Sequence, residues 1–220
     1  MHTPTKLIFL PGAAGSPNFW RPVSDLLAHP ASRTLLGWPA FDQVPADPNV
    51  RGMADLVALV LKEMDRPCAL IAQSMGGVIA VQAALKHPEM LTHLVLAVTS
   101  GGVDMSALDA EDWRQSFWAA NPAAPPWFAD YHEDLSGLIG SIRVPTLLLW
   151  GDADPISPVA VGMYLQKLLP HSSLYVLHGG KHDLVVKLAP DVARLIDEHL
   201  KNVPKLDGVT VNGGTADTAE

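Results

Sequence analysis

Cysteine is nearly absent from this chain of 220 residues, which contains only Cys68. A single cysteine cannot form a disulfide within the chain, so the fold does not depend on oxidative cross-links. Cys68 lies in an apolar run, which predicts a buried thiol, and the lack of disulfides favours a cytoplasmic location. No secretory signal pattern is visible at the amino terminus, which agrees with that expectation.

Basic residues, long apolar runs and cofactor motifs are also scarce. The 15 Lys and Arg against 23 Asp and Glu give a net charge of −8, which argues against a nucleic-acid partner. The mean hydropathy is +0.17, but no apolar run reaches the roughly 18 residues of a membrane helix, so no membrane partner is expected. Phosphate-binding and dinucleotide motifs are missing, and the histidines show no metal-ligand spacing, so neither cofactor nor metal is predicted.

The acidic excess is concentrated in one internal segment, residues 101–140. This segment contains seven acidic residues and a single basic residue, Arg114, which gives it a net charge of −6. The acidic residues are Asp104, Asp109, Glu111, Asp112, Asp130, Glu133 and Asp134. The segment interrupts the regular pattern of the chain, so we interpret it as an insertion within a single domain of residues 1–202. Residues 203–220 are polar and glycine-rich, which predicts a loosely packed tail.

Short apolar runs alternate with segments of helical periodicity along the rest of the chain. The predicted strands are residues 6–10, 33–38, 68–72, 93–98, 144–150 and 173–178. The predicted helices are residues 18–29, 49–65 with Asn49 as the cap, 75–87, 158–169 and 188–200. Strands that are apolar throughout indicate a parallel sheet buried on both faces. Right-handed crossovers then give a doubly wound α/β fold with six strands.

The stretch LIAQSMGGVIA, residues 70–80, places Ser74 at a strand-to-helix junction. Its small neighbours Ala72, Gly76 and Gly77 allow the helix to pass close to the strand. The pattern A-x-S-x-G-G differs by one methyl group from the G-x-S-x-G turn that exposes a nucleophilic serine. The alternative is a serine that only caps the helix, with glycines for close packing.

Two further motifs follow later strands, GDADPISP after residues 144–150 and GGKHDL after residues 173–178. With the Ser74 turn, they resemble the α/β-hydrolase family over about residues 5–202, in compact, carboxylesterase-like form. The resemblance implies a triad of Ser74 as nucleophile, His182 as base and Asp154 as the acid that orients the base. Asp152 is the competing acid, and His178 is interpreted as structural.

The same resemblance implies an oxyanion hole from the backbone N–H groups of Met75 and Ala13. Residues 10–16, LPGAAGS, hold Pro11 where the family often has histidine, but the backbone donor is unaffected. The chain is expected to lack the family's N-terminal hairpin, which leaves the strand order 2-1-3-4-5-6. Residues 101–140 would then be a reduced cap. Its three tryptophans, Trp113, Trp118 and Trp127, either line a substrate pocket or bury the cap against the core.

These observations predict a serine hydrolase that cleaves a carboxylic ester of a small neutral substrate through an acyl-enzyme. One alternative is a compact lyase of the menaquinone-synthesis type, or a carbon–carbon bond hydrolase, that uses the same triad. A second alternative is a hydrolase-like binding protein with an idle triad. The sequence does not specify the natural substrate or the oligomeric state.

Overall fold

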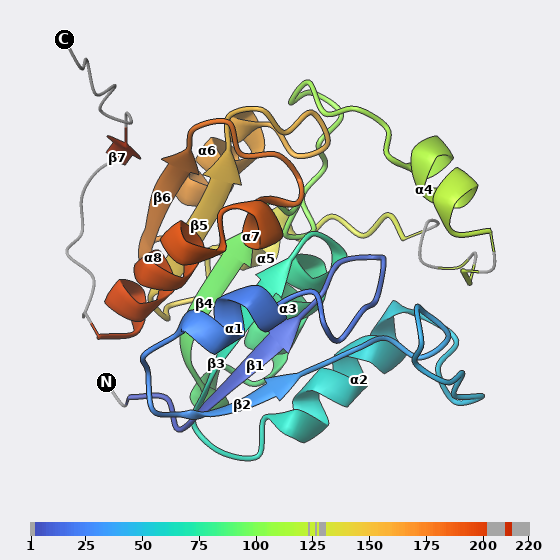
Figure 1. The fold of residues 1–220 in the computed structure, drawn as a ribbon, viewed down its shortest axis with the longest axis horizontal. Helices are drawn as coiled ribbons and strands as arrows, with labels where there is room; N and C mark the ends of the chain where they lie inside the picture. The colour runs from blue at the N-terminus through green and yellow to red at the C-terminus, as the bar shows by residue number, and fades with distance from the viewer. Residues whose placement is uncertain (1–2, 123, 126, 128–130, 202–209, 213–220) are drawn as a thin grey trace, which may run out of the picture.

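The computed structural model of the protein describes residues 3–122, 124–125, 127, 131–201 and 210–212 (Figure 1). One sheet of seven parallel strands has the order β2-β1-β3-β4-β5-β6-β7. The strands are β1 Lys6–Leu10, β2 Ser32–Leu35, β3 Cys68–Gln73, β4 Leu91–Ala97, β5 Thr146–Gly151, β6 Ser172–Leu177 and β7 Thr210–Asn212. The predicted doubly wound sheet and its order 2-1-3-4-5-6 are therefore confirmed, with β7 added beside β6.

Helices cover both faces of this sheet (Figure 1). Helices α1 and α8 pack side by side across one face, and α2, α3 and α6 cover the other. The α-helices are α1 Arg21–Leu26, α2 Met53–Glu63, α3 Met75–Lys86, α4 Arg114–Ala120, α5 Ser136–Ile139, α6 Val159–Leu168, α7 Leu184–Lys187 and α8 Ala189–Lys201, and Pro88–Met90 forms a short 3₁₀ turn. Helices α1 and α2 lie on opposite faces because the chain moves in opposite directions across the sheet from β1 to β2 and from β2 to β3, each time with a right-handed crossover.

Several element boundaries differ from the sequence prediction, and helix α1 spans Arg21–Leu26, which is shorter at both ends than the predicted residues 18–29. Helix α2 begins at Met53 with Gly52 as its cap, whereas Asn49 belongs to a turn in which Asp47 Oδ1 accepts its backbone N–H at 2.8 Å. The side chain of Asp47 thus competes with helix formation at this point. Strand β2 ends at Leu35, before the predicted residue 38. Residues 210–212 of the expected loose tail form β7, and the rest of 203–220 lies outside the described residues.

The core consists of the central strands and the apolar faces of the helices. Strands β1, β3 and β5 are buried along their whole length, whereas the edge strand β2 is partly exposed. This gradient explains why the central strands are apolar throughout and the edge strand SRTL is mixed.

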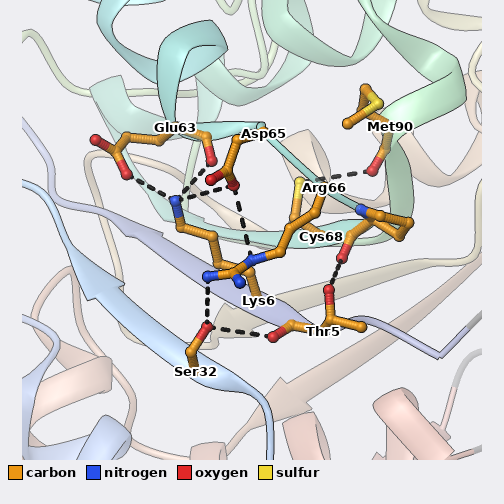
Figure 2. A network of polar contacts seen from close by, with 9 residues as sticks. Thr5, Lys6, Ser32, Glu63, Asp65, Arg66, Cys68 and Met90 are labelled. Atoms are coloured by element: carbon orange, nitrogen blue, oxygen red, sulfur yellow. Dashed lines mark hydrogen bonds and ion pairs between the residues drawn. The ribbon is translucent and has the colours of Figure 1, made fainter.

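A polar network closes the amino-terminal edge of the sheet, opposite to the loops that follow the strands (Figure 2). Lys6 Nζ donates hydrogen bonds to the Glu63 carbonyl and to Glu63 Oε2, both at 2.7 Å, and lies 3.4 Å from Asp65 Oδ1. Burial lowers the pKa of Lys6, but the bonds and charges of Glu63 and Asp65 outweigh it and raise that pKa. Cys68 is a free, buried thiol, as predicted, and burial raises its pKa to about 12.

The buried His93 and the partly buried His199 predict that the fold loses stability in mild acid. The rings of His93 and His199 meet edge-on at 5.1 Å, and burial lowers their pKa values to about 4 and about 3. Between these values and the ordinary histidine pKa, the unfolded chain binds more protons than the folded chain. The free energy of unfolding therefore falls as the pH drops below about 6.5, by at most about 1.4 kcal/mol per pH unit for each histidine.

Urea unfolding at pH 7.5 and pH 5.0 measures this loss. We expect His199→Phe, which keeps a ring of similar size, to reduce the difference between the two pH values. His87→Asn, at an exposed histidine, should leave the difference unchanged. Equal losses in the wild type and in His199→Phe would contradict the assignment.

Candidate active site

Ser74 occupies a strained turn between β3 and α3. Its backbone has φ 52° and ψ −125°, a conformation that residues with a side chain rarely adopt. The turn is held because the Ser74 carbonyl accepts the N–H of Gly77 at 2.8 Å and the hydroxyl of Thr99. This geometry lifts the Ser74 hydroxyl above the carboxyl edge of the sheet, as a nucleophile requires.

Both glycines after Ser74 are needed for the close approach of α3 to the sheet. A Cβ at Gly76 would lie 2.5 Å from the Pro11 carbonyl oxygen and 2.7 Å from that of Leu10. A Cβ at Gly77 would overlap the side chain of Thr99. The run Gly76–Gly77 is therefore explained by packing around the serine.

A continuous chain of hydrogen bonds joins Ser74 to His182 and Asp154. Ser74 Oγ lies 3.0 Å from His182 Nε2, and His182 Nδ1 lies 2.8 Å from Asp154 Oδ2. His182 follows β6 and Asp154 follows β5, so the three side chains meet at the carboxyl edge of the sheet. The Asp154 side chain is fully buried, and its Oδ1 accepts the backbone N–H groups of Ile156 at 2.9 Å and Ser157 at 3.3 Å. These bonds hold the Asp154 carboxyl group in place beside His182.

Asp152 forms a separate pair with His178. The distance from His178 Nδ1 to Asp152 Oδ2 is 2.8 Å, and the backbone N–H of Gly179 donates to Asp152 Oδ1 at 2.6 Å. The hydrogen bond from His178 lowers the pKa of Asp152. The His178 side chain is 84% exposed, so this pair lies at the surface and orders the loops after β5 and β6.

The loop after β1 lies directly beside Ser74. A Cβ at Gly12 would be 3.0 Å from Ser74 Cβ, so only glycine fits here without displacing the serine. Ala13 and Met75, the two predicted oxyanion donors, both line the pocket above Ser74. Met75 is the first residue of α3, where backbone N–H groups have no partner within the helix.

The pocket has a volume of about 950 Å³ and opens between the core and residues 101–140. Its lining includes Ser74 and His182 from the core and Trp113 and Phe117 from the segment around α4. In Figure 1, α4 stands beyond the carboxyl ends of the strands, as expected for a cap.

The three predicted pocket tryptophans occupy different places. Trp113 lines the pocket and meets Phe117 edge-on at 5.7 Å. Trp118 packs against the other side of Phe117, and Trp127 packs edge-on against Phe41 of the core. Neither Trp118 nor Trp127 is among the described residues that line the pocket. Their contacts instead hold the cap together and against the core.

Two polar contacts near the site were not anticipated from the sequence. Gln73, the residue before Ser74, is buried and its amide donates to the His182 carbonyl at 3.1 Å, which ties the histidine loop to β3. Tyr131 accepts a hydrogen bond from Gln82 of α3 at 2.8 Å and donates to Glu133 at 3.0 Å. In the sequence, a role for Gln73 could be suspected only from its position as a polar residue at the end of an apolar strand.

Among the residues that the structure describes, no cluster of three or more histidine, cysteine, aspartate or glutamate side chains is arranged to hold a metal ion. No helix within the same residues has the length and apolar character needed to cross a membrane.

Comparison with known proteins identifies the family and the fold of the chain. The model of the alpha/beta hydrolase family matches residues 7–195, so the chain belongs to that family. A thermophilic esterase from Thermogutta terrifontis superimposes with a TM-score of 0.73, 20% identity and coverage of 91% of both chains. A meta-cleavage product hydrolase from Pseudomonas fluorescens gives 0.72, 16% identity and coverage of 89% of this chain and 90% of its own. These two likenesses show the shared fold.

Curated relatives are hydrolases of more than one kind. A pimeloyl-(acyl-carrier protein) methyl ester esterase from Chromobacterium violaceum is 27% identical, over 80% of this chain and 82% of its own length. A 2-hydroxy-6-oxononadienedioate/2-hydroxy-6-oxononatrienedioate hydrolase from Cupriavidus pinatubonensis is 25% identical, over 87% of this chain and 84% of its own.

Proposed function

We propose that this protein is a serine hydrolase that cleaves carboxylic esters of small neutral substrates through an acyl-enzyme. The observation that carries the proposal is the chain of hydrogen bonds Ser74–His182–Asp154 beside the 950 Å³ pocket. A serine hydroxyl becomes a nucleophile when an adjacent base accepts its proton and a third group orients that base. The relative named as a methyl ester esterase supports the same chemistry.

In the proposed mechanism, each group acts in turn. His182, with its proton on Nδ1 toward Asp154, accepts the Ser74 proton at Nε2 as Ser74 Oγ bonds to the ester carbon. The backbone N–H groups of Ala13 and Met75 stabilise the oxyanion that forms. The carbon–oxygen bond then breaks, and His182 gives its Nε2 proton to the departing alcohol. Water, deprotonated by His182, hydrolyses the acyl-enzyme, and the proton returns to Ser74.

A carbon–carbon bond hydrolase or a lyase with the same triad is the second candidate. The relative from Cupriavidus pinatubonensis favours it, because its name denotes a dicarboxylate substrate. The charge of the pocket disfavours it. The pocket wall contains six carboxylates and one arginine, Arg114. The carboxylates are Asp104, Glu111, Asp112, Glu133, Asp134 and Asp183.

A fluorophosphonate probe tests the proposal before a natural substrate is known. We expect one probe molecule per chain, attached to Ser74, and a burst of p-nitrophenol when a p-nitrophenyl ester is added. Peptide mapping locates the modified residue, and Ser16→Ala, at another serine of the pocket wall, should label normally. A wild type that neither reacts nor turns over would instead indicate a hydrolase-like binding protein.

The acidic pocket wall predicts discrimination against anionic substrates. Carboxylates near a cleft lower the local concentration of anions, and salt screens this effect over about 10 Å at 0.1 M. For matched neutral and carboxylated esters, we expect a higher kcat/KM for the neutral ester and a smaller difference at high salt. Equal values that ignore salt would show that the wall charge is irrelevant. Faster turnover of the anionic ester would favour the second candidate.

A further inference from the structure

Two buried indoles hold three successive carbonyls at the end of β1. Trp20 Nε1 donates to the Leu10 carbonyl at 2.9 Å. Trp38 Nε1 donates to the Pro11 carbonyl at 3.0 Å and to the Gly12 carbonyl at 3.1 Å. Trp20 is 1% exposed and Trp38 is 0% exposed. In such a buried site, water does not replace a lost indole bond, so the indole helps to determine the direction of each carbonyl that it contacts.

The two indoles orient different peptide units. In a trans peptide, the carbonyl and the N–H of the next residue point in opposite directions, and no cis peptide is found among the described residues. By holding the Gly12 carbonyl, Trp38 therefore fixes the direction of the Ala13 N–H. The Leu10 carbonyl shares its peptide unit with Pro11, which has no N–H, so Trp20 orients no donor.

The Ala13 N–H is oriented toward the catalytic side of this loop. The Gly12 carbonyl also accepts the backbone N–H of Gly15 at 3.0 Å, and the backbone N–H of Trp38 donates to the Gly15 carbonyl at 3.0 Å. The carbonyl side of the loop is thus turned toward Trp38, away from the pocket. Ala13 lines the pocket, and no described residue accepts its N–H.

We propose that Trp38 is a positioning residue for the oxyanion hole. Its indole N–H holds the Pro11 and Gly12 carbonyls so that the Ala13 N–H faces the substrate oxygen beside Ser74. Pro11 offers no side-chain donor to this loop, and Trp38 supplies one from the chain that follows β2. The inference rests on the proposed function, because an oxyanion forms only if Ser74 attacks a carbonyl.

Removing the indole N–H while keeping the ring tests this inference. Trp38 is replaced by phenylalanine and, separately, by benzothienylalanine, in which sulfur takes the place of the N–H at nearly constant volume. We expect kcat for a p-nitrophenyl ester to fall about 10- to 100-fold, with KM within about threefold, because the lost stabilisation is realised only in the transition state. The Kd of a trifluoromethyl ketone, which forms a similar oxyanion on Ser74, should rise by the same factor.

Trp20→Phe is the matched control, since it removes an equivalent buried bond one residue earlier. It should lower the Tm but leave kcat within about threefold of the wild type. The inference is overturned if the Trp38 variants keep kcat within threefold, if their loss appears only in KM, or if Trp20→Phe reduces kcat equally. The benzothienylalanine variant keeps the packing, so it decides the matter if Trp38→Phe does not fold.

Labelling of the wild type separates this inference from the function on which it rests. A wild type that labels at Ser74 and turns over, with Trp38 variants that behave like Trp20→Phe, overturns the inference alone. A wild type without any reaction at Ser74 overturns both.

Discussion

Replacement of Ser74 by alanine is expected to reduce kcat for a p-nitrophenyl ester by about 10⁶-fold, because removal of the nucleophile leaves only binding and oxyanion stabilisation. A residual rate of about 10³-fold over the uncatalysed reaction is the expected remainder. The protein should stay folded, since alanine removes one oxygen and meets the same backbone strain at φ 52°. Steady-state kinetics and thermal unfolding of the purified variant measure both effects.

Ser100→Ala provides the matched control for this substitution. Ser100 also lines the pocket, and its hydroxyl accepts only the backbone N–H of Gly102, at 3.2 Å. Its loss should change kcat less than about threefold. Activity of Ser74→Ala within tenfold of the wild type would remove Ser74 from the mechanism.

Asp154→Asn should lower kcat by about 10⁴-fold, with little change in KM. An asparagine amide facing His182 favours the tautomer that carries its proton on Nε2, and that tautomer cannot accept the Ser74 proton. The Asp154 carboxylate is fully buried and bonded to two backbone N–H groups, so the variant also loses stability. Kinetics at a temperature well below the Tm of the variant separate the catalytic effect from unfolding.

Asp152→Asn is the natural comparison, since Asp152 also pairs with a histidine at 2.8 Å. We expect kcat to fall less than tenfold, because its partner His178 lies at the surface and does not contact Ser74. If Asp152→Asn were the more damaging change, the acid of the triad would be Asp152 and not Asp154.

The sequence predicted the fold well because the central strands carry a strong physical signal. Burial on both faces requires apolar residues throughout, so strands such as β3 and β5 could be located within two residues. The edge strand β2 was predicted to end three residues too late, at residue 38 and not at Leu35. Gly37 and Trp38 continue its apolar pattern, but they leave the sheet to pack on the loop after β1. Apolar residues in the sequence indicate burial, but they do not indicate whether the buried residue lies in a strand or in the loop that follows it.

The site was predictable where it depends on short motifs and not where it depends on loop geometry. Ser74, His182 and Asp154 each follow a strand, and parallel strands bring such residues to one edge. The spacing alone left Asp152 and Asp154 as alternatives. The two carboxylates contact different histidines, Asp152 with His178 and Asp154 with His182. This arrangement depends on the bond between the loops after β5 and β6, in which the Ala153 N–H donates to the Gly180 carbonyl at 3.0 Å. The bonds of Gln73 and Trp38 link distant segments, which periodicity does not reveal.

Cys68 is a buried thiol at the amino-terminal edge of the sheet, so its chemical reactivity can report local unfolding around β3. Its side chain has no exposed surface, and burial raises its pKa to about 12, which disfavours the reactive thiolate at neutral pH. A thiol reagent therefore reacts only after the chain has separated around β3. At reagent concentrations where the reaction rate no longer rises, that rate gives the frequency of opening of the core, in a protein whose proposed active site lies at the opposite edge of the same strand.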